Sequence, residues 1–448
     1  MRTHGIAMIM LLAIGLTVGT GVADPPPRTA DQRAETSEAE KLFQKGRDAL
    51  LTGQYDEAVK LLAKAVAADE TQTSYRLHLA RAYCYAGKSG PAETHLKAIL
   101  KITPEHVEAG QLLAEIHARQ KNWKGVVEVL EPLLKYRHDY TTYHMLAEAT
   151  YNLDQHDKAR KHFEEAIKLN PQSASDHYQL GNLYLAGKFY ALAAEAYQSA
   201  IRLGTDSPVL RYKLASALFN LRNYFGKIAV VTVKAGKVGE ISKGWYLIEP
   251  VPGRTDTFRA APANSAIYQI AKAVADGIED RPDIHFLMAS IYLNARRHRQ
   301  AYGMFEKIQA KIPKEDKALF YYYYAQAAFG IGKYDRYLKL LAEAINLDKA
   351  AYEPTLVEAY VKVAEQHNQL GELDKYIHYL QLAVAASPQT ASLHLKLGYA
   401  YEEARKYDLA VVQWRMVLEL EPDHADRMKL INLIGKHEVS APAKPKTD

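Results

Sequence analysis

Residues 391–424 read ASLHLKLGYAYEEARKYDLAVVQWRMVLELEPDH, and this stretch decides the fold of the chain. Small residues stand at its positions 8 and 20, which are Gly398 and Ala410, and a proline, Pro422, stands at position 32. Small side chains at this spacing let two antiparallel helices cross closely while large apolar side chains fill the space around the crossing. Proline ends the second helix because it has no N–H for the preceding turn. The stretch therefore predicts a helix–turn–helix unit, whose helices we call A and B.

The same pattern returns about ten times along the chain, at a spacing close to 34 residues. Besides one interrupted unit described below, the units start near residues 39, 73, 107, 140, 174, 282, 318, 357 and 391. Five of them share a proline at position 32, namely Pro104, Pro171, Pro313, Pro388 and Pro422. This periodicity resembles the tetratricopeptide repeat (TPR). The resemblance implies an all-α, right-handed superhelical solenoid of about ten helix–turn–helix repeats.

One unit is interrupted. Residues 208–281 begin like a normal helix A, but they span 74 residues, about 40 more than a repeat needs. The extra segment, residues 223–262, contains the β-branched run 228–233, several glycines and the apolar run 245–248. Such runs between glycines and prolines are typical of strands, so we predict a β-hairpin inserted at the turn between helices A and B. Helical spacing resumes near Ala263.

The repeat boundaries divide the rest of the chain. We predict repeat arrays over residues 39–222 and 263–424, followed by an amphipathic capping helix at 425–437 that covers the last unit. Residues 24–38 and 438–448 lack helical periodicity and are rich in proline and polar residues, so we expect both to be disordered.

The first 23 residues carry a targeting pattern. Arg2 precedes an apolar stretch, Ile6–Val22, and Ala23 is followed by Asp24 and three prolines. This resembles a secretory signal with cleavage after Ala23, so we expect an exported protein, periplasmic or secreted, without a transmembrane segment after cleavage. The alternative is an uncleaved N-terminal membrane anchor, since the stretch is near the shortest length that spans a bilayer.

Composition and motifs argue against several function classes. The chain has 448 residues and a net charge of only +5 with no long basic run, which disfavours nucleic-acid binding. Gly87-Lys88-Ser89 resembles the end of a phosphate-binding loop, but Ala82 stands where its first glycine is needed. No HExxH spacing and no Ser/His/Asp set can be placed. We therefore predict no catalytic residue, no metal site and no cofactor.

Tyrosine is unusually frequent, with 31 residues, and some of these tyrosines point to a binding surface. The TPR resemblance implies that positions 2, 5, 9, 12 and 13 of helix A face a concave groove. The candidates at positions 5, 9 and 13 are Tyr178, Asn182, Tyr212, Asn220, Asn294 and Tyr322. Aromatic faces beside amides suit an extended peptide or a sugar chain. Ordinary packing at partly exposed positions is the alternative interpretation.

One use of the fold is not expected here. In chaperone-binding members of the family, a clamp for a terminal carboxylate needs lysine at position 5 and asparagine at position 9 of one unit. The unit with Asn182 at position 9 has Tyr178 at position 5, and the next unit has Ser216 at position 9. The clamp is therefore absent.

A second candidate surface is electrostatic. The turns between helices A and B lie on one edge of such a solenoid, so the insertion should lie beside the turn that contains Arg296, Arg297 and Arg299. The insertion adds Lys237, Lys243 and other basic residues. We predict a positive edge that attracts an acidic partner or an anionic polysaccharide. A solvated hairpin that only shields the array is the alternative.

These patterns together predict a non-catalytic protein–protein interaction scaffold in the cell envelope, with an extended peptide or protein partner in the groove. The alternative is a polysaccharide-binding or accessory subunit of a complex that processes or exports envelope glycans or exopolysaccharide. The chain resembles repeat proteins that organise such bacterial machinery, and this resemblance concerns only fold and targeting.

Overall fold

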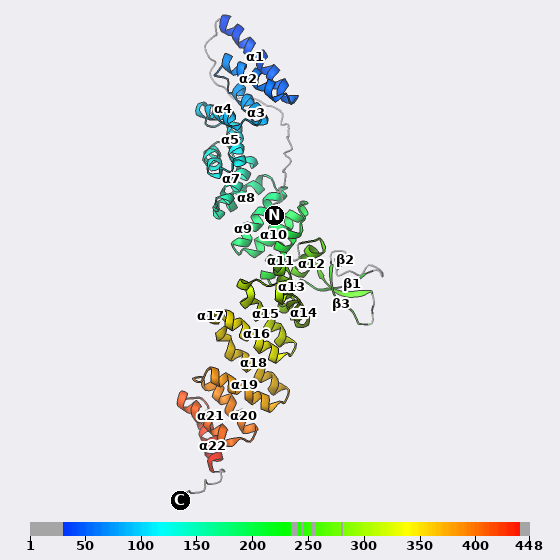
Figure 1. The fold of residues 1–448 in the computed structure, drawn as a ribbon, viewed down its shortest axis with the longest axis vertical. Helices are drawn as coiled ribbons and strands as arrows, with labels where there is room; N and C mark the ends of the chain where they lie inside the picture. The colour runs from blue at the N-terminus through cyan, green and yellow to red at the C-terminus, as the bar shows by residue number, and fades with distance from the viewer. Residues whose placement is uncertain are drawn as a thin grey trace. The chain divides into compact units, whose positions relative to one another are not determined.

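The structure is a computed structural model that describes residues 30–233, 241–242, 245–252, 254, 256–278 and 281–439. The signal-like segment 1–23 and the C-terminal segment from residue 440 lie outside the described residues. The chain divides into two compact units, Met1–Asn170 and Pro171–Asp448. Each consists mainly of antiparallel helix pairs that follow one another along the chain (Figure 1).

The described part of the first unit, residues 30–170, contains four helix pairs. They are α1 (Ala30–Leu51) with α2 (Tyr55–Ala68), α3 (Thr73–Tyr85) with α4 (Ser89–Ile102), α5 (Val107–Arg119) with α6 (Trp123–Leu130), and α7 (Tyr140–Asn152) with α8 (His156–Leu169); η1 (Glu131–Lys135) extends α6. Helix α1 begins at Ala30, so residues 30–38, which we expected to be disordered, are helical. This stretch has no proline after Pro27 and is rich in alanine and glutamate, which favour helix.

Among the described residues of the second unit there are six further pairs and a last helix. The pairs are α9 (Ala174–Ala186) with α10 (Tyr190–Arg202), α11 (Pro208–Asn220) with α12 (Ala266–Ala275), α13 (Pro282–Asn294) with α14 (His298–Ile308), α15 (Lys317–Gly330) with α16 (Tyr334–Leu347), α18 (Leu356–Gln369) with α19 (Leu373–Ala386), and α20 (Ala391–Glu403) with α21 (Tyr407–Leu420). Short helices connect some pairs: η2 (Gln309–Lys311), η3 (Lys314–Asp316), α17 (Lys349–Tyr352) and η4 (Glu353–Thr355). Helix α22 (Arg427–Val439) packs on α21, at the place predicted for a capping helix.

The small residues at positions 8 and 20 do allow close crossings. Ala410 and Trp414 are fully buried on α21, and a Cβ atom built on Gly398 of α20 would lie only 2.5 Å from the Trp414 Nε1. In the same way, a Cβ atom placed on Gly181 of α9 would lie only 2.7 Å from the ring of Tyr197. The repeated pairing confirms the predicted fold class, an all-α array of helix pairs with one β insertion.

The insertion is larger than the single hairpin predicted. It forms a four-stranded antiparallel sheet in the order β1-β4-β3-β2, from β1 (Ala229–Thr232), β2 (Ile241–Ser242), β3 (Trp245–Pro250) and β4 (Thr257–Pro262). Strands β3 and β4 are the central hairpin, and β1 pairs with β4 rather than with its neighbour in sequence. Val233, Leu247 and Ala260 form a small core of their own.

The sheet is attached to the helix pairs at several points. The hydroxyl groups of Tyr246 on β3 and Tyr292 on α13 lie 2.5 Å apart, and Phe225 packs against the Tyr292 ring. The backbone N–H of Ala266 donates to the Asn223 carbonyl at 2.9 Å. Helix α12 begins here, three residues later than the predicted resumption at Ala263, because Ser265 caps its N-terminus.

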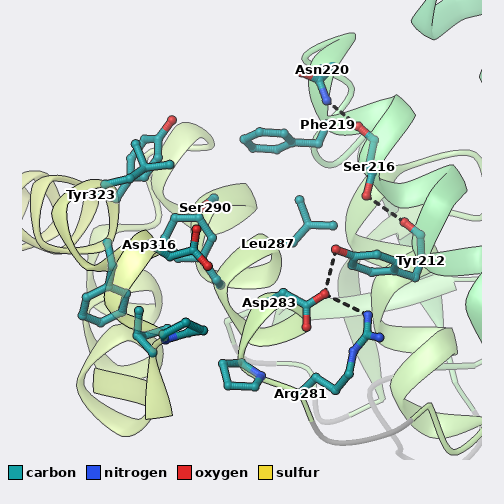
Figure 2. A pocket seen from close by; sticks show the side chains of 16 residues that line it. Tyr212, Ser216, Phe219, Asn220, Arg281, Asp283, Leu287, Ser290, Asp316 and Tyr323 are labelled. Carbon is teal, nitrogen blue, oxygen red and sulfur yellow. Dashed lines mark hydrogen bonds and ion pairs between the residues drawn. The ribbon is translucent and has the colours of Figure 1, made fainter. Parts of the chain in front are cut away.

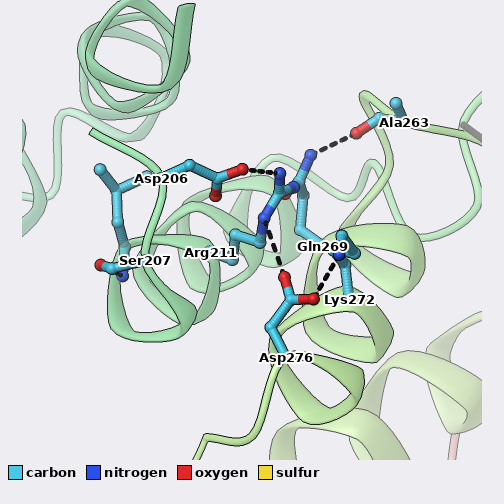
Figure 3. A network of polar contacts seen from close by, with 8 residues as sticks. Asp206, Ser207, Arg211, Ala263, Gln269, Lys272 and Asp276 are labelled. Carbon is cyan, nitrogen blue, oxygen red and sulfur yellow. Dashed lines mark hydrogen bonds and ion pairs between the residues drawn. The ribbon is translucent and has the colours of Figure 1, made fainter. Parts of the chain in front are cut away.

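A buried polar network joins α11 to α12 across the insertion (Figure 3). Arg211 is only 7% exposed; its Nη1 donates to Gln269 Oε1 at 2.8 Å and its Nη2 to Asp206 Oδ2 at 2.5 Å. Its Nε lies 3.8 Å from the Asp276 carboxylate, and Gln269 in turn donates to the carbonyl of Ala263. Because Arg211 precedes Tyr212 on α11, this network helps to position the groove side of the helix.

The close crossing can be tested with two glycines in helices. Gly398→Ala should destabilise the protein by about 1–3 kcal/mol, because the added methyl group would overlap the buried indole of Trp414. Gly303 lies in α14 with no atom within 4 Å of a built Cβ, so Gly303→Ala should stabilise the protein by about 0.5–1 kcal/mol. Urea denaturation measures both changes. Equal effects would contradict the close contact at Gly398.

The polar network can be tested at Gln269. Gln269→Met should lower the free energy of unfolding by about 1–3 kcal/mol, because it leaves Arg211 Nη1 and the Ala263 carbonyl without their bonds. Gln300 is exposed on α14, so the matched control Gln300→Met should change stability by less than about 0.5 kcal/mol. A Gln269 variant as stable as the control in urea denaturation would mean that the network does not hold α12.

Candidate functional site

A cavity of about 690 Å³ lies within the second unit, between the A helices of three consecutive repeats (Figure 2). Its volume falls within the range of known ligand pockets, about 300–1,000 Å³. The lining residues come from α11 (Tyr212, Ser216, Phe219, Asn220), from α13 and its N-cap (Arg281, Pro282, Asp283, Phe286, Leu287, Ser290), from the connection before α15 (Ile312, Pro313, Asp316) and from α15 itself (Leu319, Phe320, Tyr323). Asn220, Asp316 and Leu319 are exposed, so the cavity opens to solvent.

Helical periodicity explains why these residues meet. On α11, Tyr212, Ser216 and Phe219 are spaced by four and three residues and therefore share one face. They stand at positions 5, 9 and 12 of their repeat, and Phe286 and Ser290 stand at positions 5 and 9 of the next. The cavity therefore lies on the face that the repeat pattern assigns to the groove.

The polar end of the cavity is a three-residue cluster. The Tyr212 hydroxyl donates to Asp283 Oδ2 at 3.1 Å, Arg281 Nη2 donates to the same oxygen at 2.8 Å, and the guanidinium lies 5.9 Å from the tyrosine ring centroid. Burial, together with the Asp283 carboxylate, raises the pKa of Tyr212 to about 12. Tyr212 therefore stays protonated at neutral pH and remains a hydrogen-bond donor to Asp283.

The wall formed by α13 contains an unusual hydroxyl group. Ser290 is 3% exposed, and its Oγ has no hydrogen-bond partner among the residues that the structure describes. A buried polar group without a partner costs about 1–3 kcal/mol. A ligand group placed in the cavity would relieve this cost by bonding to the Ser290 hydroxyl.

On the other side of α11, Lys213 extends toward α9. Its ammonium donates to the Tyr178 hydroxyl at 3.0 Å and to Asn182 Oδ1 at 2.7 Å, and it lies 4.8 Å from the Tyr178 ring centroid. Asn182 Oδ1 also accepts a hydrogen bond from Tyr197, which is fully buried. Two of the predicted groove residues therefore belong to a lysine-centred cluster.

The six predicted groove residues make different kinds of contact. Tyr212 and Asn220 line the cavity, although the Asn220 amide donates to the carbonyl of Ser216 on its own helix. Asn294 makes the same kind of bond, to Ser290, and lies outside the cavity lining. Tyr322 stacks on Tyr352 of α17, with ring centroids 5.0 Å apart.

Several residues that line the cavity are not among the groove residues predicted from the sequence. Phe286 and Ser290 occupy groove positions 5 and 9, so the register alone could have identified them. Pro313 and Asp316 belong to the connection before α15, where no repeat rule tells which side chains reach the groove.

The predicted basic edge is only partly described. Arg296 and Arg299 are exposed at the α13–α14 turn and Arg297 is half-buried, whereas Lys237 and Lys243 lie outside the described residues. The Tyr246–Tyr292 contact places the described part of the insertion against α13. The positive edge stays a proposal.

Among the residues that the structure describes, no three His, Cys, Asp or Glu side chains are grouped so that they could hold a metal ion. In the same part of the chain, no helix has the length and apolar character needed to cross a membrane.

Comparisons with known proteins agree with the repeat pattern. Residues 144–208 and 392–424 each match a family model described as tetratricopeptide repeat. The chain is similar to protein O-mannosyl-transferase TMTC1 of Homo sapiens, with 27% identity over 223 residues, which cover 47% of this chain and 24% of TMTC1. The chain thus spans about a quarter of the length of that relative.

Among solved structures, MamA from Desulfovibrio magneticus RS-1 is 22% identical with a TM-score of 0.35, covering 38% of this chain and 98% of that one. YrrB, described as a TPR protein with an unusual peptide-binding site, is 16% identical with a TM-score of 0.35, covering 51% of this chain and 93% of that one. The two family matches fall on α7–α10 and on α20–α21, which share the helix-pair geometry of the other described repeats. The chain therefore contains tetratricopeptide repeats, matched directly over residues 144–208 and 392–424.

Proposed function

We propose that this protein is a non-catalytic scaffold that binds an extended peptide segment of a protein partner in the cavity between α11, α13 and α15. The observation that carries the proposal is the cavity itself, which lies between three consecutive A helices and which α11 and α13 line mainly at their groove positions. Its apolar side chains, Phe219, Phe286 and Leu287 among them, suit an inserted apolar side chain. The polar cluster at Asp283 and the hydroxyl of Ser290 suit hydrogen bonds to a backbone.

The tyrosines at position 5 favour a peptide over a polysaccharide. Sugar rings bind by stacking on open aromatic faces. Tyr178 has one face against Lys213, Tyr212 has one against Arg281, and Tyr322 has one against Tyr352. Each of these rings therefore has one face covered by another side chain and offers less open surface for a sugar to stack on. The apolar cavity, in contrast, is open to an inserted side chain of a peptide.

The chemistry of the cavity supports binding rather than catalysis. A serine nucleophile needs a base within hydrogen-bond reach, whereas Ser290 Oγ has no such partner among the described residues. Asp283 is engaged by Arg281 and by the Tyr212 hydroxyl, whose pKa of about 12 keeps it protonated. These residues therefore do not provide one group that could act as a general acid together with another that could act as a general base.

The cavity can be tested with two matched substitutions. Leu319 is 42% exposed at the cavity, so Leu319→Arg should fill the groove without unfolding the protein. Leu192 is 44% exposed on α10 and does not line the cavity, which makes Leu192→Arg the control. Peptides selected from a random phage-displayed library on the wild-type chain should bind the Leu319 variant about ten-fold more weakly or worse and bind the control unchanged. Equal binding to both variants, measured by fluorescence anisotropy, would overturn the proposal.

We also infer that the scaffold works outside the cytoplasm, on the basis of the signal-like residues 1–23. Intact mass and N-terminal sequencing of the protein recovered from its cells should give a chain that begins at Asp24. A chain that keeps residues 1–23 and sediments with membranes would favour the N-terminally anchored alternative.

A further inference from the structure

Lys213, whose ammonium contacts the groove residues Tyr178 and Asn182, has no carboxylate partner among the residues that the structure describes, and this defines a second subsite. Resting on the function proposed above, we propose that Lys213 binds an acidic side chain of the partner segment whose apolar side chain enters the cavity. The partner is then an extended peptide with Asp or Glu on one side of α11 and a large apolar residue on the other.

Lys213 keeps an unused hydrogen-bond donor. Its ammonium carries three N–H groups, and the two acceptors found are neutral, the Tyr178 hydroxyl and the Asn182 amide oxygen. Over the described part of the chain, no carboxylate lies within ion-pair distance of Lys213. The side chain is half-buried, so its charge is only partly solvated. A half-buried cation with neutral neighbours attracts an anionic group.

Lysines at the corresponding repeat position elsewhere in the chain are paired with carboxylates, Lys396 across to the preceding repeat and Lys362 within its own helix. Lysine stands at position 6 in three repeats, as Lys213, Lys362 and Lys396. Lys396 forms an ion pair with Glu365, which is position 9 of the preceding repeat, and Lys362 forms one with Glu358 at 2.8 Å. Position 9 before Lys213 is Asn182 instead of a glutamate. The asparagine holds the ammonium in place without neutralising it.

The ammonium is also held in a fixed place. Asn182 Oδ1 accepts a hydrogen bond from the buried Tyr197 at 3.0 Å, and its Nδ2 donates to Gln179 at 3.0 Å. The amide that orients Lys213 is therefore itself oriented by two bonds. A cation ordered before binding loses little conformational freedom when a carboxylate arrives.

The distance between the subsites sets the spacing in the ligand. Lys213 contacts α9, whereas its neighbours Tyr212 and Ser216 line the cavity on the α13 side. A peptide that crosses α11 must span roughly one helix diameter, about 10 Å, and an extended chain covers about 3.3 Å per residue. We therefore expect the acidic and apolar residues to be separated by about three or four positions.

The test uses the full chain and a set of fluorescein-labelled, C-terminally amidated peptides. Each contains one Phe and one Glu, placed one to six residues apart in a Ser/Ala/Thr background, and each has a Gln counterpart. At the favoured spacing, the Glu peptide should bind about ten-fold more tightly than its Gln counterpart. This preference should decrease with added salt.

Two variants should abolish the preference without abolishing binding. Asn182→Glu recreates the Lys396–Glu365 arrangement and neutralises Lys213, and Lys213→Met removes the charge. Both should bind the Glu and Gln peptides equally, with thermal melting confirming that they fold. Lys396→Met is the matched control, because that lysine is already paired, and it should keep the wild-type preference.

Other results would contradict the inference. Equal binding of Glu and Gln peptides to the wild type, or a preference that survives both variants, excludes an acid-binding role for Lys213 while leaving the cavity proposal intact. If the free-acid forms of the same peptides bind tightly and the amidated forms do not, the assignment to a side chain would also be overturned. Loss of all dependence on Leu319, by contrast, would mean that the proposed function itself is wrong.

Discussion

The close crossing of helices A and B is the contact on which the rest of the structure depends. Where Gly398 faces Trp414 and Gly181 faces Tyr197, the absence of a side chain lets a large aromatic ring fill the space between the helices. Interiors packed this densely tolerate little change in helix position. Each pair therefore has nearly the same shape, and equivalent positions of successive A helices face the same way. The groove is a consequence of this repetition.

The insertion interrupts this repetition without destroying it. Arg222, with φ of 59°, adopts the left-handed conformation that also ends helix A in the other repeats, so α11 ends normally before the sheet begins. Arg211 and Gln269 then hold α12 against α11, although they are 58 positions apart. Breaking such a buried network is costly, because it leaves the Arg211 guanidinium without acceptors. The insertion thus leaves α11 in place beside α13, and the cavity between them is preserved.

Identical backbone geometry leaves the choice of side chain to determine the chemistry of each repeat. Lys396 faces Glu365 and Lys213 faces Asn182 at corresponding positions, yet one pair is neutral and the other carries a charge. The same holds for position 5, where Tyr212 contacts a guanidinium and Tyr322 contacts another tyrosine. A TPR groove is therefore best understood as a row of equivalent positions whose occupants set the local charge and shape.

The helix pairs, their register and the place of the insertion could be predicted from the order of residues alone, because small residues and prolines repeat with a period that the helix geometry imposes. The same register identified Tyr212 and Asn220, which line the cavity. Only the tertiary structure decided that β1 pairs with β4, because strand pairing is a long-range choice that residues 223–262 do not encode by periodicity. It also decided that Asp316 reaches the cavity and that Tyr322 is covered by Tyr352, because both contacts involve connections outside the repeat. Local periodicity encodes which face of a helix is buried, whereas the neighbours of that face depend on how the whole chain packs.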